Sequence, residues 1–83
     1  MTKSVARDLG PYGVNVNAVA PGITETDMVR ALARELKDRF VAEIVLGRMG
    51  QPEDVAHLVT FLCSDQARHI TGEVIKVDGG QYM

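Results

Sequence analysis

The sequence predicts an α/β fold in which two short parallel strands are joined by helices. Two runs with a strand pattern, residues 14–20 and 73–78, flank a long segment whose apolar residues recur at helical spacing. Two parallel strands need a connection of about a dozen residues or more, usually helical and right-handed. Residues 21–72 provide such a connection, so we expect the two strands to be parallel neighbours.

The N-terminal residues are expected to form a helix. Met1, Val5 and Leu9 recur four residues apart, and Gly10-Pro11 is a typical helix end. No capping residue precedes this pattern, which indicates the last turns of a longer helix. Met1 is then either an internal methionine or a start placed inside a longer gene.

Residues 14–20 alternate between two faces, as a strand does. One face carries Val14, Val16, Ala18 and Ala20, and the other carries Asn15, Asn17 and Val19. A half-exposed strand would carry charged residues on its polar face, whereas this run has only amides there. We therefore expect both faces to be covered and the asparagine amides to have hydrogen-bond partners.

The segment after this strand predicts one or two amphipathic helices over residues 27–46. Its apolar residues at spacings of three and four are Val29, Leu32, Leu36, Phe40 and Ile44. Thr26 or Asp27 can cap the helical start, and Gly47 can end it.

A further helix is expected to begin at Pro52, with two acidic residues in its first turn, and to stop near Ser64. Residues 73–78 are rich in β-branched side chains and form the second predicted strand, which Gly79-Gly80 closes. Two parallel strands leave one edge unpaired and their faces only partly covered. We therefore expect residues 1–83 to be an incomplete C-terminal part of one domain.

Composition excludes several classes of function. The 83 residues carry a formal net charge of −2, which does not favour binding to nucleic acid or to an anionic membrane. No apolar run approaches the roughly 20 residues of a membrane span, and no signal peptide is visible, so we expect a cytoplasmic protein. The single cysteine, Cys63, is expected to be a buried core thiol, and no metal-ligand cluster is visible.

Three stretches resemble the C-terminal third of short-chain dehydrogenases/reductases, and most of all the 3-oxoacyl-acyl-carrier-protein reductase group. These stretches are GVNVNAVAPGITETDM, GRMGQPEDVAHLVTFLCSD and ITGEVIKVDGG. The resemblance implies a doubly wound, Rossmann-type parallel sheet that binds NADP or NAD. Residues 1–83 would then be the incomplete C-terminal part of a dinucleotide-binding domain, containing its last two strands and the helices between them.

The resemblance also implies a cofactor site in the loop after the first strand. Pro21 and Gly22 would lie beside the nicotinamide, the backbone of Thr24 would contact its carboxamide, and the Thr26 hydroxyl would bond to the cofactor. An alternative for Thr26 is a purely structural role as a helix N-cap, and one threonine can do both. Residues 24–47 correspond to the substrate loop of the family.

No catalytic residue of the family matches a position in this sequence. The glycine-rich loop and the catalytic Asn, Ser, Tyr and Lys lie upstream in the family, and neither Tyr12 nor Tyr82 is followed four residues later by lysine. His57 and His69 match no catalytic position and are expected to be solvated or locally bonded. We therefore expect the chain alone to be inactive.

Two functions follow as hypotheses. In the first, the complete protein is an oxidoreductase that transfers hydride between a nicotinamide cofactor and a carbonyl or hydroxyl substrate, with 3-oxoacyl thioesters of fatty-acid biosynthesis as leading candidates. It would form a homo-oligomer through residues 52–64 and 73–78. In the second, the chain is a non-catalytic interaction module that binds a subunit surface of the family.

Overall fold

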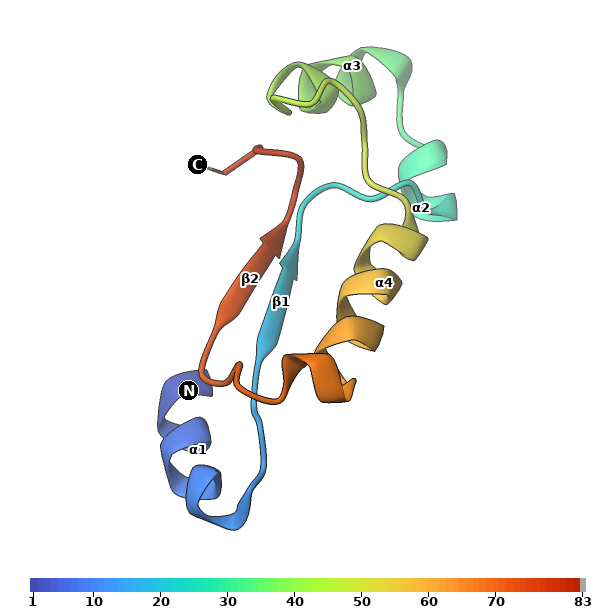
Figure 1. The fold of residues 1–83 in the computed structure, drawn as a ribbon. Coiled ribbons are helices and arrows are strands. Elements are labelled where there is room, and N and C mark those ends of the chain that lie inside the picture. The colour runs from blue at the N-terminus through green and yellow to red at the C-terminus, as the bar shows by residue number, and fades with distance from the viewer. Residues whose placement is uncertain (83) are drawn as a thin grey trace.

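Two parallel strands with helices between them form the centre of the fold (Figure 1). The computed structural model describes residues 1–82. Strand β1 (Ala18–Pro21) pairs with β2 (Val74–Val77) in a register that runs from Ala18 opposite Val74 to Pro21 opposite Val77. The predicted α/β fold with parallel strands is confirmed.

Helix α1 (Thr2–Leu9) ends where the sequence predicts, but by a different device. Gly10 keeps a right-handed conformation with φ −52°, and it begins the 3-10 helix η1 (Gly10–Tyr12). The left-handed residue is Gly13, with φ 75°. A residue without Cβ is needed at that position because the left-handed region is strained for other residues.

Strand β1 is shorter than the predicted run, because residues 14–17 make no strand ladder. The Asn15 amide instead donates to the carbonyls of Arg68 at 2.8 Å and Ile70 at 2.9 Å. The Asn17 amide donates to Ile70 at 3.0 Å, and its oxygen accepts from the backbone N–H of Glu73 at 3.1 Å. The expectation that both amides find partners is confirmed.

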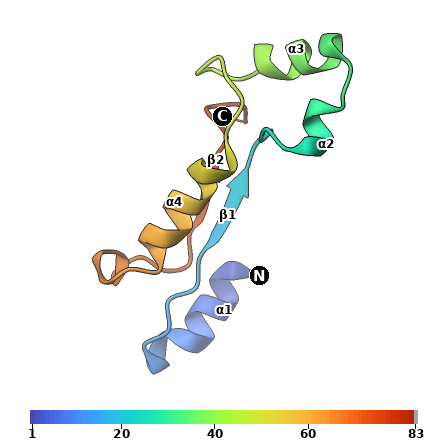
Figure 2. The same cartoon turned by 90° about the vertical axis from the view of Figure 1, so that its right-hand side faces the viewer.

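The middle of the chain forms two short helices and one longer one. These are α2 (Asp27–Arg30), α3 (Arg34–Ala42) and α4 (Pro52–Leu62), and the 3-10 helix η2 (Asp65–Ala67) follows. Helix α4 packs along β1, whereas α2 and α3 lie beyond the carboxyl ends of the strands (Figures 1 and 2). The predicted helices are confirmed, but η2 was not predicted.

Few residues are buried. Among residues 1–82, the buried apolar residues are Ala6, Ile44 and Ala67. The accessible surface is 6270 Å², about 1,400 Å² more than a compact 9.0 kDa protein exposes. The radius of gyration is 15.5 Å, against about 12 Å for a compact domain of this length. Much apolar surface is therefore left uncovered.

The expectation of a buried Cys63 is wrong, because Cys63 is exposed. It follows the last residue of α4, a helix that packs on the sheet mainly through β1. A residue on an apolar helical face stays exposed where no second element covers that face. His57 and His69 are exposed, as expected. None of the helices described over residues 1–82 has the length and apolar character needed to cross a membrane.

Candidate functional site

The loop of residues 21–26 leaves β1 at its carboxyl end, where open parallel sheets bind ligands. Pro21 is the last residue of the strand and lies opposite Val77. The next residue, Gly22, continues the contact with β2 by donating its N–H to the Val77 carbonyl at 3.1 Å. The chain then turns away from the sheet toward α2, as the ribbon in Figure 1 shows.

Gly22 is required by the packing of the two strand ends. A Cβ at this position would lie 2.6 Å from the Cβ of Asp78 and 2.9 Å from its Cα. The same Cβ would lie 2.9 Å from the side-chain oxygen of Gln81, which accepts from the Ile23 N–H at 3.1 Å. The absent side chain thus makes room for the backbone that follows β2.

Thr24 lies in a short parallel bridge with Gly50. Gly50 donates to the Ile23 carbonyl at 3.2 Å and accepts from the Glu25 N–H at 2.8 Å. In this geometry the backbone N–H and C=O of Thr24 point away from Gly50. Within residues 1–82 these two groups have no hydrogen-bond partner, so Thr24 offers one donor and one acceptor to a ligand.

Thr26 is the N-cap of α2. Its hydroxyl oxygen accepts from the backbone N–H of Val29 at 3.3 Å, and its extended φ of −124° is typical of this position. The capping role of Thr26 is therefore present in the structure. Because the cap uses the oxygen as acceptor, the hydroxyl proton is still available for a second partner.

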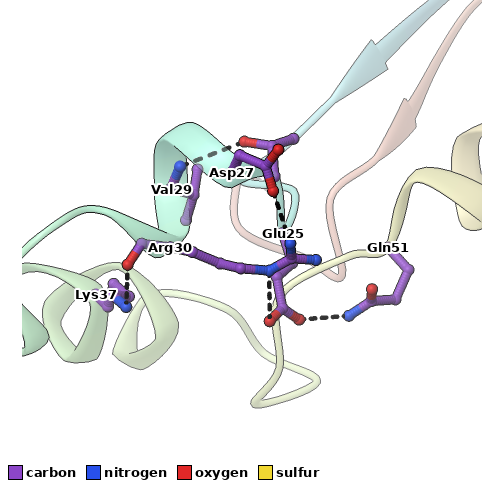
Figure 3. Close-up of polar contacts among 7 residues, drawn as sticks. Glu25, Asp27, Val29, Arg30, Lys37 and Gln51 are labelled. Carbon is purple, nitrogen blue, oxygen red and sulfur yellow. Dashed lines mark hydrogen bonds and ion pairs between the residues drawn. The ribbon is translucent and has the colours of Figure 1, made fainter.

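Glu25 joins this loop to the start of α4 (Figure 3). One carboxylate oxygen accepts from the Gln51 amide at 2.7 Å, and the other lies 3.7 Å from the Arg30 Nε. Arg30 also bonds to Asp27 at 2.8 Å. The hydrogen bond from Gln51 lowers the pKa of Glu25, desolvation opposes this effect, and the Arg30 charge adds to the lowering.

Glu25 and Gln51 are not among the site residues that the sequence predicts. A local signal exists for Gln51, because it precedes a helix that has proline at its first position and Asp54 three residues after the cap. The Asp54 carboxylate indeed accepts from the Gln51 backbone N–H at 2.8 Å. No local pattern indicates the contact between Glu25 and Gln51, which lie far apart in the sequence.

A cavity of about 520 Å³ lies next to this loop, between the 45–50 turn, the first turn of α4 and residues 76–80. The predicted site residues Pro21, Gly22, Thr24 and Thr26 do not line it, although Gly50, the bridge partner of Thr24, does. Among the residues that the structure describes, no group of three or more His, Cys, Asp and Glu residues could hold a metal ion. The four predicted residues thus lie together at the end of β1 and in the loop that follows it, outside this cavity.

Comparison with known proteins identifies the family. A family described as enoyl-(acyl carrier protein) reductase matches residues 1–81. The 3-oxoacyl-[acyl-carrier-protein] reductase FabG of Aquifex aeolicus (strain VF5) is 56% identical over 81 residues, which cover 98% of this chain and 33% of that protein. A 3alpha-hydroxysteroid dehydrogenase of Mediterraneibacter gnavus is 54% identical over 79 residues, which cover 95% of this chain and 32% of that protein.

A solved structure agrees with these relatives. The crystal structure of a 3-oxoacyl-[acyl-carrier protein] reductase from Brucella melitensis matches with a TM-score of 0.97 and 41% identity, covering 99% of this chain and 31% of that chain. The chain spans about a third of the length of the relatives it matches. It belongs to the short-chain dehydrogenase/reductase family and is similar to the 3-oxoacyl-[acyl-carrier-protein] reductases within it.

Proposed function

We propose that residues 1–83 are the incomplete C-terminal part of a single dinucleotide-binding domain in an NAD(P)-dependent oxidoreductase. The complete enzyme would transfer hydride between a nicotinamide cofactor and a carbonyl or hydroxyl substrate. The leading substrate is a 3-oxoacyl thioester, a class supported by the names of the relatives from Aquifex aeolicus and Brucella melitensis. The steroid dehydrogenase among the relatives supports the proposal that the enzyme is an oxidoreductase, but it does not support a 3-oxoacyl thioester as the substrate.

The unpaired backbone of Thr24 is the observation that carries this proposal. A nicotinamide carboxamide has one carbonyl acceptor and one amide donor, and Thr24 offers the matching N–H and C=O. In the proposed site, the Thr26 hydroxyl donates a second hydrogen bond, and the backbone of Pro21 and Gly22 forms the adjoining wall. When bound, the cofactor supplies or accepts the hydride. The proposal covers NADP and NAD alike, because both carry the carboxamide.

No residue of this chain is proposed to be catalytic. The proposed proton donor and the glycine-rich phosphate loop belong to a part of the enzyme outside residues 1–83. The role of the chain is to bind and orient the nicotinamide and, through residues 24–47, to cover the substrate. We place the enzyme in the cytoplasm.

The proposed enzyme is a homo-oligomer that associates through residues 52–64 and 73–78. Three apolar side chains in these segments support this surface, since Val59 and Phe61 are each 42% exposed and Val74 is 54% exposed. Exposed apolar side chains on a helix and on a strand are what a subunit interface would cover.

The proposed function is tested by restoring the rest of the domain. In a chimeric reductase, this chain replaces the matching segment of the Aquifex aeolicus relative, and reduction of a 3-oxoacyl thioester is followed by oxidation of NADPH or NADH. We expect turnover by the chimeric reductase and none by the 83-residue chain. A folded chimeric reductase that neither binds cofactor nor turns over contradicts the proposed function, and turnover by the chain alone contradicts the assignment of catalysis to other residues.

One edge of β1 has no strand partner within residues 1–82, and this edge favours a second function, that of an interaction module. Ala18 donates to Glu73 at 2.8 Å and Gly22 donates to Val77, so the backbone groups of Val19 between them face away from β2. An open edge beside uncovered apolar surface can accept a strand from another polypeptide. Stable binding of the purified chain to a complete related reductase subunit, without any contribution to its turnover, supports this second function over the first.

A further inference from the structure

The α2–α3 segment stands beyond the sheet and is attached at its two ends (Figures 1 and 2). At the first end, Gly50 bonds to the backbone of Ile23 and Glu25 at 3.2 Å and 2.8 Å. At the second end, the Leu46 N–H donates to the Gly79 carbonyl at 3.0 Å. The position of Thr26, which lies just beyond the first attachment, therefore depends on how firmly that attachment is held.

Gln51 provides a fixed point for the first attachment. It is the N-cap of α4, and its backbone N–H is held by the Asp54 carboxylate at 2.8 Å. Helix α4 in turn packs against β1. The Gln51 side chain donates to Glu25 at 2.7 Å, so Glu25 is tied to an element that rests on the sheet.

The same carboxylate also reaches α2. Its second oxygen faces the Arg30 guanidinium, which also bonds to Asp27 in the first turn of the helix (Figure 3). Asp27 and Arg30 both belong to the short helix that Thr26 caps. One carboxylate therefore links the helix after Thr26 to the start of α4.

We propose that Glu25 is a positioning residue that holds the Thr26 hydroxyl in place for the cofactor by linking α2 to the Gln51 side chain. The inference rests on the proposed function, because its effect is on cofactor binding through Thr26. Exposed ion pairs add little to global stability, so loss of Glu25 should leave the fold intact. Binding groups must be held to within about 0.5 Å, so the same loss should weaken cofactor binding.

The test uses the chimeric reductase defined above and compares Glu25→Ala with Asp8→Ala. Asp8 is an exposed acidic residue of α1, outside the proposed site, and within residues 1–82 its carboxylate makes no hydrogen bond or ion pair. We expect Glu25→Ala to raise the Kd for NADPH by about two- to tenfold, with a melting temperature close to that of the parent. Asp8→Ala should change neither quantity.

A double-mutant cycle shows whether Glu25 acts through Thr26. In a Thr26→Val background, Glu25→Ala should raise the Kd by less than about twofold, because the hydroxyl that it positions is absent. The double variant Glu25→Gln/Gln51→Glu exchanges the two side chains, so an amide can again donate to a carboxylate between positions 25 and 51. This double variant should recover part of the affinity for NADPH. This exchange also serves as the second variant if Glu25→Ala does not fold.

Two results would overturn the inference while leaving the proposed function intact. One is a Kd for NADPH in folded Glu25→Ala equal to that of the parent. The other is the same loss in both backgrounds, which would mean that Glu25 acts independently of Thr26. A parent chimeric reductase that binds neither NADPH nor NADH would instead contradict the proposed function itself.

Discussion

Gly22 lies so close to Asp78 that a Cβ on the glycine would stand 2.6 Å from the Asp78 Cβ. This contact joins the ends of the two strands. An added Cβ would also lie 2.9 Å from the Asp78 Cα, a backbone atom that cannot move aside as a flexible side chain can. Gly22→Ala in the chimeric reductase should therefore lower the free energy of unfolding by about 1–3 kcal/mol, as measured by chemical denaturation.

Gly10 provides the matched control for this substitution. Its backbone is right-handed, and a Cβ there would meet no heavy atom within 4 Å. Gly10→Ala should leave stability unchanged or raise it by about 0.4–1 kcal/mol. Equal stabilities for the two alanine variants would show that Gly22 is not required by the approach of Asp78.

Asn15 should stabilise the connection between α4 and β2. Its amide donates to the backbone carbonyls of Arg68 and Ile70, and more weakly to that of Ala67 at 3.4 Å. Asn15→Asp keeps the shape but places an acceptor against these carbonyls, and we expect it to lower the free energy of unfolding by about 1–3 kcal/mol. Gln66→Glu makes the same amide-to-acid change in η2, at an exposed side chain that makes no hydrogen bond within residues 1–82, and is the control. A loss no larger than that of the control would contradict the role of Asn15.

The lowered pKa of Glu25 predicts how the affinity for NADPH depends on pH. Because the pKa of this carboxyl in the fold is lowered from its ordinary value of 4.5, its contribution is present above 4.5 and is lost as the pH falls through the lowered value. Affinity of the chimeric reductase for NADPH should therefore show no Glu25-dependent change between about pH 5 and 8. Titration of the parent and Glu25→Gln over this range checks this, and a Glu25-dependent transition near neutral pH would contradict it.

The sequence pattern predicted the elements whose signals are local. Alternation in residues 14–20 and β-branched residues in 73–78 indicated two strands, and the long connection indicated that they are parallel. The uncharged polar face of the first run indicated that Asn15 and Asn17 would be bonded. The resemblance placed Pro21, Gly22, Thr24 and Thr26 on one loop, and their contact with a cofactor stays a prediction.

What the sequence did not indicate depends on partners distant along the chain. The ladder begins at Ala18 because Asn15 and Asn17 before it bond through their side chains to the segment that precedes β2. The exposure of Cys63 depends on how little of α4 is covered by other elements, among which β1 is its main partner in the sheet. The contact between Glu25 and Gln51 arises only when the loop after β1 meets the start of α4.

Substitutions of Thr26 distinguish a cofactor-binding role of this residue from a purely structural one. Thr26→Val removes the N-cap of α2 and should lower the free energy of unfolding by about 1 kcal/mol. Thr26→Ser and Thr26→Asp keep a capping oxygen and should have the stability of the parent. A purely structural role would therefore change the melting curves and leave cofactor affinity unaltered in the folded protein. Thr24→Val should weaken cofactor binding less than Thr26→Val does, because the proposed contact of Thr24 is through its backbone.

The most direct measurement is the Kd for NADPH, and in parallel for NADH, of folded Thr26→Val in the chimeric reductase. Valine keeps the shape of threonine but cannot donate, so we predict a loss of one hydrogen bond, about 0.5–1.5 kcal/mol or up to roughly tenfold in Kd. Thr26→Ser, which keeps the hydroxyl, should bind like the parent. An unchanged Kd in folded Thr26→Val would contradict the assignment of the Thr26 hydroxyl to the nicotinamide site.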